Sequence, residues 1–205
     1  MKTTLLTLLF SILITAGFAQ TTKIGIEGGL NIANQTGFGK YAGISTLVAF
    51  NAGITVDMDF KDFAFQPGLL YSGKGHSQTI YLNPSYGHFT TQVIRTQLNY
   101  LDVPLNLVGK LYASKNVSFN LGGGAYFGMG VSASSTGQGQ TTQLGFGDNG
   151  IFRSVDYGAN VVAEAEFNDF FLIKTNYSYG LADISHNAAE WHNHVFGLSV
   201  AFLFK

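Results

Sequence analysis

The sequence contains no cysteine, only three prolines and few charged residues. Without cysteine there is no disulfide framework, no thiolate metal site and no cysteine nucleophile. Charged residues make up 11% of the chain, less than half of the roughly one quarter that is usual for a soluble domain. Because 46% of the residues are hydrophobic and 14% are aromatic, an intrinsically disordered chain is also excluded. The formal net charge of −1 argues against a nucleic-acid-binding protein, which needs a basic surface.

Long apolar runs are also scarce: there is one, at the extreme N-terminus. A helical membrane protein would repeat apolar runs of about 20 residues. Lys2 precedes the apolar segment 5–14, and Gly17-Phe18-Ala19 supplies the small residues that a signal peptidase recognises. This pattern predicts a secretory signal peptide over residues 1–19, cleaved near Ala19, in preference to a buried N-terminal helix. Residues 20–205 then form a single exported domain, without a cysteine for N-terminal lipidation.

In the rest of the chain, hydrophobic residues recur with a period of two, which is typical of strands, and not with the helical period of 3.6. In segment 195–204, for example, Phe196, Leu198 and Val200 share one face. Most of the predicted strands are longer than the five or six residues usual in soluble proteins, and long enough to cross a bilayer when tilted. The eight predicted strands are 24–32, 48–60, 63–72, 100–111, 117–129, 155–167, 171–180 and 195–204.

The connections between the predicted strands alternate between short and long. Three short ones carry turn residues, at Lys61-Asp62, Ser114-Lys115-Asn116 and Asn168-Asp169. The long ones are rich in Gly, Ser, Thr, Gln, Asn and His and cover roughly 33–43, 75–95, 132–151 and 183–192. Bacterial outer-membrane barrels alternate short periplasmic turns with long extracellular loops in this way. The sequence therefore predicts an all-β fold, an eight-stranded antiparallel up-and-down transmembrane β-barrel located in the cell outer membrane.

One face of each predicted strand is apolar and the other is small and polar. A soluble sandwich or barrel would place its large apolar side chains inside. Here we expect lipid to cover the apolar face and the polar face to line a narrow, largely filled interior. Charges of both signs should pair there, because a lone buried charge is costly, and we expect Glu164 and Glu166 to pair with Lys110 or Lys174. The predicted interior polar network consists of Glu27, Asp57, Lys74, Asp102, Lys110, Asp156, Glu164, Glu166 and Lys174.

Glycine and proline within the predicted strands indicate local irregularities. Gly122-Gly123-Gly124 lacks the Lys-Ser/Thr of a phosphate loop, and we interpret it as a bend that leaves room inside a curved barrel. Pro67 and Pro104 each remove one donor from the hydrogen-bond ladder. We expect a bulge or a locally unpaired position at each proline.

The predicted loops contain residue types that enzymes and metal sites use. Ser185, His186 and Asp183 adjoin one another, and His88 lies in a different loop, which raises the alternative of a hydrolase or lipid-modifying enzyme at the outer rim. A metal site at the rim would draw on the histidines His76, His88, His186, His192 and His194. Neither set has a spacing specific for such chemistry, and these residues are common in loops. We therefore expect no catalytic residue, no metal and no cofactor.

Four segments carry a resemblance to a known family: Tyr100-Leu101-Asp102-Val103-Pro104-Leu105, and residues 25–31, 156–164 and 177–184. They are similar to the PorT-like outer-membrane β-barrel proteins of Bacteroidetes, often called the "porin family". The first segment resembles the family's Tyr-Leu-Glu-Ile-Pro-Leu signature, with Asp102 in place of Glu. Val162 replaces a usual Gly, and Lys205 follows the usual terminal aromatic residue. The resemblance implies an outer-membrane barrel whose role is mostly uncharacterised, and one member of the family is implicated in type IX secretion.

Fold and composition together predict an integral outer-membrane barrel with a structural or loop-mediated binding role. A small passive pore is the alternative, and a rim enzyme a lesser one. The partners that we expect are outer-membrane lipid and, during insertion, the barrel-assembly machinery, for which Phe204 could serve as the recognised aromatic residue. An extracellular ligand or protein partner is not identified by any motif, and we expect no nucleic acid.

Overall fold

The computed structural model describes residues 21–37, 43–60, 62–82, 90–114, 116–148, 150–186 and 189–205, so the predicted signal peptide lies outside the described residues. The strands are β1 (Thr21–Thr36), β2 (Ile44–Ser45), β3 (Leu47–Asp59), β4 (Phe63–Leu82), β5 (Thr90–Ala113), β6 (Val117–Gly137), β7 (Gln140–Leu144), β8 (Val155–Phe167), β9 (Phe171–Gly180) and β10 (His192–Phe204). Within these ranges, no helix has the length and hydrophobicity needed to cross a membrane.

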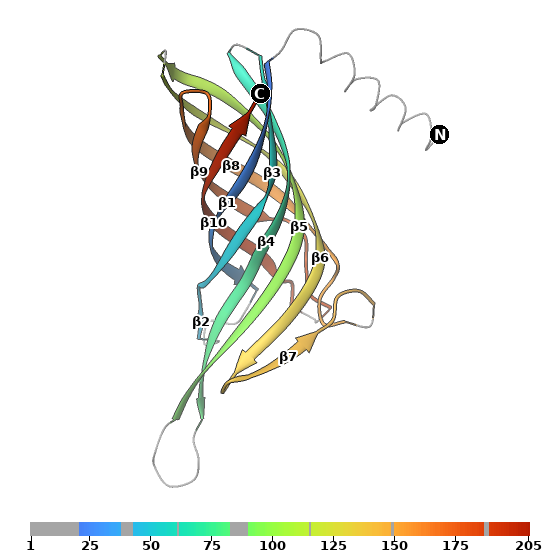
Figure 1. The fold of residues 1–205 in the computed structure, drawn as a ribbon. Coiled ribbons are helices and arrows are strands. Elements are labelled where there is room, and N and C mark those ends of the chain that lie inside the picture. The colour runs from blue at the N-terminus through green and yellow to red at the C-terminus, as the bar shows by residue number, and fades with distance from the viewer. Residues whose placement is uncertain are drawn as a thin grey trace, which may run out of the picture.

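Eight of the strands form a closed antiparallel ring in the order β1, β3, β4, β5, β6, β8, β9 and β10, and β10 pairs with β1 to complete it. Figure 1 shows the strands tilted around a common axis. The short strands β2 and β7 lie outside the ring and pair with β4 and β6. The predicted eight-stranded antiparallel barrel is confirmed. Because the ring is closed, each long strand has a partner on both sides within the barrel.

The alternation of side chains along each strand produces an apolar outer surface and a polar interior. In β1, Ile24, Ile26 and Leu30 are 57–65% exposed, whereas Lys23 and Glu27 are buried. The same alternation recurs around the ring, so large aliphatic and aromatic side chains cover the outside. In water such a surface would be unstable, and it is the surface that a barrel presents to lipid.

The short turns gather at one end of the barrel, where β1 begins and β10 ends (Figure 1). At the β8–β9 turn, Asn168 and Asp169 adopt positive φ angles of 53° and 58°, as their residue types favour. Phenylalanines cluster beside these turns: the Phe60 and Phe63 rings stack at 4.7 Å, and the Phe170 ring lies 5.6 Å from that of Phe202. The predicted turn at Lys61 and Asp62 joins β3 to β4, with Lys61 outside the described residues.

At the opposite end, the structure corrects the predicted loops. Strand β4 continues to Leu82 and β5 begins at Thr90, so most of the predicted loop 75–95 is a long hairpin that projects beyond the ring (Figure 1). Likewise β6 runs to Gly137 and β7 pairs back against it, within the predicted loop 132–151. The prediction was wrong here because these segments are mostly polar and their few apolar residues are consecutive, as in Ile80-Tyr81-Leu82 and Val93-Ile94, which removes the alternation that reveals a strand.

The two mid-strand prolines leave gaps in the ladder, as expected. Pairing between β3 and β4 stops at Thr55–Gly68 and resumes at Met58–Phe65, skipping Pro67. Pairing between β4 and β5 skips the position of Pro104 in the same manner, and in both cases the register is unchanged, so no bulge forms. At Gly124, a Cβ atom would lie 2.0 Å from the Leu105 carbonyl oxygen, so the close approach of β5 and β6 requires glycine there.

Candidate functional site

The inner face of the ring carries a dense set of charged side chains. Eight of the nine residues predicted for the interior polar network are at least nine-tenths buried: Glu27, Asp57, Lys74, Asp102, Asp156, Glu164, Glu166 and Lys174. The ninth, Lys110, is partly exposed near the short-turn end and pairs with Asp59, with Nζ and Oδ2 2.6 Å apart. In an eight-stranded barrel the interior is just wide enough for side chains, so these groups meet across it.

The most enclosed part of the interior is centred on Lys74. Its ammonium Nζ lies 2.9 Å from Asp102 Oδ2 and 2.9 Å from Asp156 Oδ2. It also lies 4.8 Å and 4.2 Å from the ring centroids of Tyr100 and Tyr126. The Tyr126 hydroxyl donates to Asp156, which accepts a further hydrogen bond from Asn193 Nδ2 at 3.0 Å. This cluster joins β4, β5, β6, β8 and β10 around one cation.

Two further lysines form buried pairs, but not with the predicted partners. Lys174 pairs with Glu27, and Lys23 pairs with Glu166. The expectation that Glu164 or Glu166 pairs with Lys110 or Lys174 was therefore wrong. In a narrow barrel, a side chain across the interior is as close as the neighbour on the adjoining strand, and sequence spacing does not report that distance. Lys23 was missed because it precedes the predicted strand, although the alternation Lys23, Gly25, Glu27 continues to it.

Glu164 is held by an amide. The Nε2 atom of Gln66 donates to Glu164 Oε2 and to Asp57 Oδ2, at 2.9 Å in each case. One amide group thus bridges two carboxylates near the short-turn end. Among the described residues, Glu164 has no cation within 4.0 Å, and its side-chain hydrogen bond comes from the Gln66 amide.

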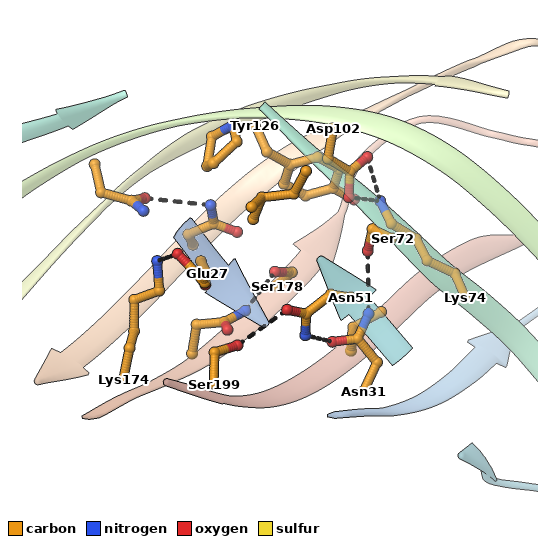
Figure 2. Close-up of a pocket in the computed structure, with 16 residues that line it drawn as sticks. Glu27, Asn31, Asn51, Ser72, Lys74, Asp102, Tyr126, Lys174, Ser178 and Ser199 are labelled. Atoms are coloured by element: carbon orange, nitrogen blue, oxygen red, sulfur yellow. Dashed lines mark hydrogen bonds and ion pairs between the residues drawn. The ribbon is translucent and has the colours of Figure 1, made fainter. Parts of the chain in front are cut away.

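A small cavity lies among these groups (Figure 2). Its volume is about 50 Å³, enough for a few water molecules. Polar side chains line it in a continuous chain: Asn51 Nδ2 donates to Asn31 Oδ1, Asn31 Nδ2 donates to Ser72, and Ser199 donates to Asn51 Oδ1. Lys174 with Glu27 and Lys74 with Asp102 border the same cavity. The interior at this level is therefore largely filled with polar side chains and contains little free space.

At the long-loop end, an aromatic plug covers this polar interior. The plug consists of Leu98, Tyr100, Phe146, Phe152, Ile184 and Trp191. Segments 145–154 and 181–191 bring its last four members to the inward-facing Leu98 and Tyr100, and the two segments are joined by a hydrogen bond from Arg153 N to the Ile184 carbonyl oxygen. Neighbouring rings lie 5.4 Å apart for Tyr100 and Phe146 and 6.0 Å apart for Phe152 and Trp191.

The plug depends on a glycine that sequence reasoning did not single out for it. A Cβ atom at Gly130 would lie 2.6 Å from the ring of Phe146. Gly130 directly follows the predicted strand 117–129, and no local pattern connects it with a ring 16 positions away. Phe146 and Trp191 lie in segments that were predicted to be loops, and Phe152 directly follows one of them; a single hydrophobic residue there gives no periodic signal.

A family model described as "Outer membrane protein beta-barrel domain" matches residues 18–186. The chain belongs to this family. Similar solved structures include Neisserial surface protein A (NspA), at 13% identity over 90% of this chain and 99% of that one, with a TM-score of 0.48. Ail of Yersinia pestis is 16% identical over 89% and 98% of the two chains (TM-score 0.45), and OprG of Pseudomonas aeruginosa 11% identical over 90% and 97% (TM-score 0.44). No curated protein matches the chain.

Membership of this family places the barrel in the outer membrane, with lipid against its apolar surface. In outer-membrane barrels the short turns face the periplasm and the long connections face the outside. The Phe60–Phe63 and Phe170–Phe202 clusters are then at the periplasmic side. The plug, the β4–β5 hairpin and the β6–β7 hairpin are extracellular.

The extracellular residues considered for catalysis are engaged in holding the plug segments. Asp183 Oδ1 accepts hydrogen bonds from the backbone N–H groups of Ser185 and Trp191, each at 3.0 Å, and its Oδ2 lies 3.1 Å from Arg153. Desolvation alone would raise the pKa of Asp183, but these two backbone donors and Arg153 outweigh it and hold the pKa below 3.8. Ser185 is fully buried. His186, the third member of the set, borders a shallow hollow beside Arg153 and Asp183.

The histidines considered for a metal site do not form a cluster. His76 lies buried on the inner face of β4, where Nδ1 is 2.6 Å from Gln35 Oε1. His194 lies on the outer surface between Tyr177 and Tyr179, with its Nδ1 atom 3.2 Å from the Tyr177 hydroxyl. His88 is outside the described residues. In the part of the chain that the structure describes, no three His, Cys, Asp or Glu side chains are placed to hold a metal ion.

Proposed function

We propose that the protein is a closed, non-conducting barrel whose role at the cell surface is structural or binding. The observation that carries this proposal is the double closure of the barrel. The ion pairs of Lys23, Lys74 and Lys174 fill the interior, and the aromatic plug covers its extracellular end. A hydrated channel would have to break several buried ion pairs at once, each costly to separate in a low dielectric.

Planar-bilayer recording of the refolded protein tests this directly. We expect no steady single-channel current in the unmodified protein, because the cavity in the interior is only about 50 Å³ and the plug covers the extracellular end of the barrel. A large porin measured in the same bilayer verifies the assay. Steady current steps from properly folded protein would overturn the proposal in favour of the passive pore.

We also propose that the protein has no enzymatic activity. The Asp183 carboxylate accepts two backbone hydrogen bonds and faces Arg153, and Ser185 is fully buried within the plug segment 181–191. A triad needs the carboxylate to orient the histidine and the serine to reach a substrate. A Ser185→Ala variant should therefore leave surface phenotypes and any background hydrolysis of lipid esters unchanged. Loss of a hydrolytic activity in that variant would contradict the proposal.

Within the outer-membrane β-barrel proteins, we propose that this protein is related to the PorT-like proteins of Bacteroidetes. Support comes from the position of the signature segment: Tyr100 and Asp102, two of its members, both contact the Lys74 ammonium. If the segment has the same role here as in the family, Asp102→Glu should preserve the Lys74 pair and change the free energy of unfolding by less than Asp102→Asn. Equal losses in the two variants would argue against that shared role.

For insertion into the membrane we propose that the barrel-assembly machinery recognises Phe204, which is half-exposed at the end of β10.

A further inference from the structure

The extracellular hairpins share one continuous sheet face, which we call the outer polar face. Cross-strand pairs place side chains on the same side of a sheet, and β5, β6 and β7 are paired in register: Gln97 with Ser134 and Ser134 with Gln143, then Arg95 with Thr136 and Thr136 with Thr141. The outer polar face is therefore formed by Arg95, Gln97, Ser134, Thr136, Thr141 and Gln143. The opposite side of the same strands contains Leu98, Ala133 and Leu144, which pack with the plug.

The outer polar face continues the lipid-facing surface of the barrel. Leu101 of β5 is 41% exposed on the outer surface, and Gln97 and Arg95 lie on the same side, four and six residues further along the strand. At about 3.3 Å per residue, Gln97 is about 13 Å and Arg95 about 20 Å beyond Leu101. On β6, the exposed side chains change from apolar to polar directly after Met129 and Val131. From this change of side chains we place the start of the face at the outer edge of the hydrocarbon, and beyond Arg95 the same side of β5 also has the exposed Val93.

The chemistry of the face is amide and hydroxyl with little charge. Residues 75–82, 90–98 and 131–144 contain no Asp or Glu, and Arg95 is their one Lys or Arg. Side-chain amides and hydroxyls both donate and accept hydrogen bonds, which matches the hydroxyl groups of sugars. The Thr136 and Thr141 hydroxyls are already 3.0 Å apart across the strand pair, so they are held in position before any ligand arrives. The Arg95 guanidinium adds a group that pairs with phosphate or carboxylate.

We propose that the outer polar face binds the sugar portion of the glycolipid in the outer leaflet of the membrane that surrounds the barrel. The continuity of the face with the lipid-facing surface favours this source over a soluble polysaccharide, because the first sugars of a membrane-anchored glycolipid lie at this height and cannot diffuse away. The inference rests on the surface role in the proposed function and names the ligand class for it.

Strand β7 offers a matched pair of variants. Thr141 and Gln143 belong to the outer polar face, whereas Gln140 and Thr142 alternate with them on the opposite side, and all four are exposed. Thr141→Ala with Gln143→Ala removes one hydroxyl and one amide from the face. Gln140→Ala with Thr142→Ala removes the same groups from the other side of the same strand. Both double variants should fold, because β7 lies outside the ring, and their heat-modifiable gel mobility checks this.

The measurement is binding of the detergent-solubilised barrel to lipopolysaccharide with a complete core oligosaccharide, to lipid A, and to the free core oligosaccharide, each by titration. We expect lipopolysaccharide to bind more tightly than lipid A and the free oligosaccharide to compete poorly. The outer-face variant should bind lipopolysaccharide more weakly, by about fivefold for each hydrogen bond lost, while the opposite-side variant keeps the original affinity.

Equal affinity for lipopolysaccharide and lipid A would overturn the proposal, as would equal losses in the two double variants. Equally strong competition by the free oligosaccharide would also overturn it, in favour of a soluble polysaccharide. These outcomes are separate from the conductance test. A conducting barrel that binds the glycolipid sugar would contradict only the closed state, and a closed barrel that does not bind it would contradict only this inference.

Discussion

The ammonium of Lys74 and the carboxylate of Asp156 lie 2.9 Å apart at the most enclosed point of the barrel, with side-chain exposures of 2% and 0%. Asp102 lies at the same distance on the other side of the ammonium. One cation thus compensates two buried anions. Removing it would leave both carboxylates without a charge partner in a medium that solvates them poorly.

For this reason we expect Lys74→Met to lower the free energy of unfolding by about 3–5 kcal/mol. Urea titration of the refolded barrel in lipid vesicles, followed by Trp191 fluorescence, measures this. The matched control is Lys110→Met, because the Lys110–Asp59 pair is about one-fifth exposed and should contribute at most about 1 kcal/mol. Equal losses in the two variants would show that the burial of the Lys74 cluster has no energetic consequence.

The plug should be sensitive to one methyl group. Gly130→Ala would place a carbon 2.6 Å from the Phe146 ring, so the ring must leave its position between Tyr100 and Phe152. We expect a loss of about 1–3 kcal/mol, typical of overpacking, and faster thermolysin cleavage within segment 145–154. Gly109→Ala is the control, since its new carbon would have 3.8 Å of clearance to the Leu121 carbonyl oxygen. Unchanged cleavage in Gly130→Ala would mean that Phe146 does not need the space.

The plug segments should also open in strong acid. Because the folded-state pKa of Asp183 lies below its ordinary value of 3.8, the stabilisation is complete above that value and is lost as the pH falls through the lowered pKa. Trp191, the single tryptophan, donates its backbone N–H to Asp183 and reports the change by fluorescence. We expect constant emission from about pH 8 to pH 5 and a shift only in stronger acid.

Two variants separate Asp183 from other carboxylates. Asp183→Asn keeps an acceptor oxygen for the backbone donors but cannot titrate, so the acid shift of Trp191 emission should disappear. Asp148→Asn removes an exposed carboxylate from the neighbouring segment, and the shift should remain. A shift that persists in Asp183→Asn would assign it to a different group.

The β8–β9 turn provides a test at the periplasmic end. Asn168 adopts a φ of 53°, a conformation that costs a β-branched residue about 1–2 kcal/mol. Asn168→Val should destabilise the barrel by that amount, whereas Asn168→Gly should change its unfolding free energy by only a few tenths of a kcal/mol, as judged from the urea midpoint. If valine were tolerated as well as glycine, the turn would have to adopt a different backbone conformation in the membrane.

The ring was predictable because its strands separate two very different environments. Alternation of the kind seen from Phe196 to Phe204 arises where the two faces of a strand meet different environments, here lipid outside and the packed barrel interior inside, and the residue order shows that contrast directly. The β4–β5 and β6–β7 hairpins lie beyond the lipid, where both faces tolerate Thr, Ser and Gln. Their strands therefore have no hydrophobic period, and they were predicted to be loops.

The composition of the interior was predictable, but its pairing was not. Alternation assigns Lys174 and Glu164 to the same inner face, and they are even cross-strand neighbours. Yet the Lys174 ammonium contacts Glu27. The choice depends on side-chain reach across a curved interior, a three-dimensional quantity. The plug is a stronger case, because Phe146, Phe152 and Trp191 are separated along the chain and are brought together only when two segments cross the barrel mouth.

The pairing of β1 with β10 has a consequence for the assembly of the barrel. Ile24 lies opposite Phe204, so the free edge of β1, which is synthesised before β10, stays unpaired until β10 is in place. An uncovered edge in hydrocarbon leaves a row of unsatisfied backbone groups, and contacts this distant in sequence form slowly. The membrane therefore cannot receive the chain strand by strand. Closure must be a single late event, and until it occurs some other surface has to shield the two open ends of the sheet.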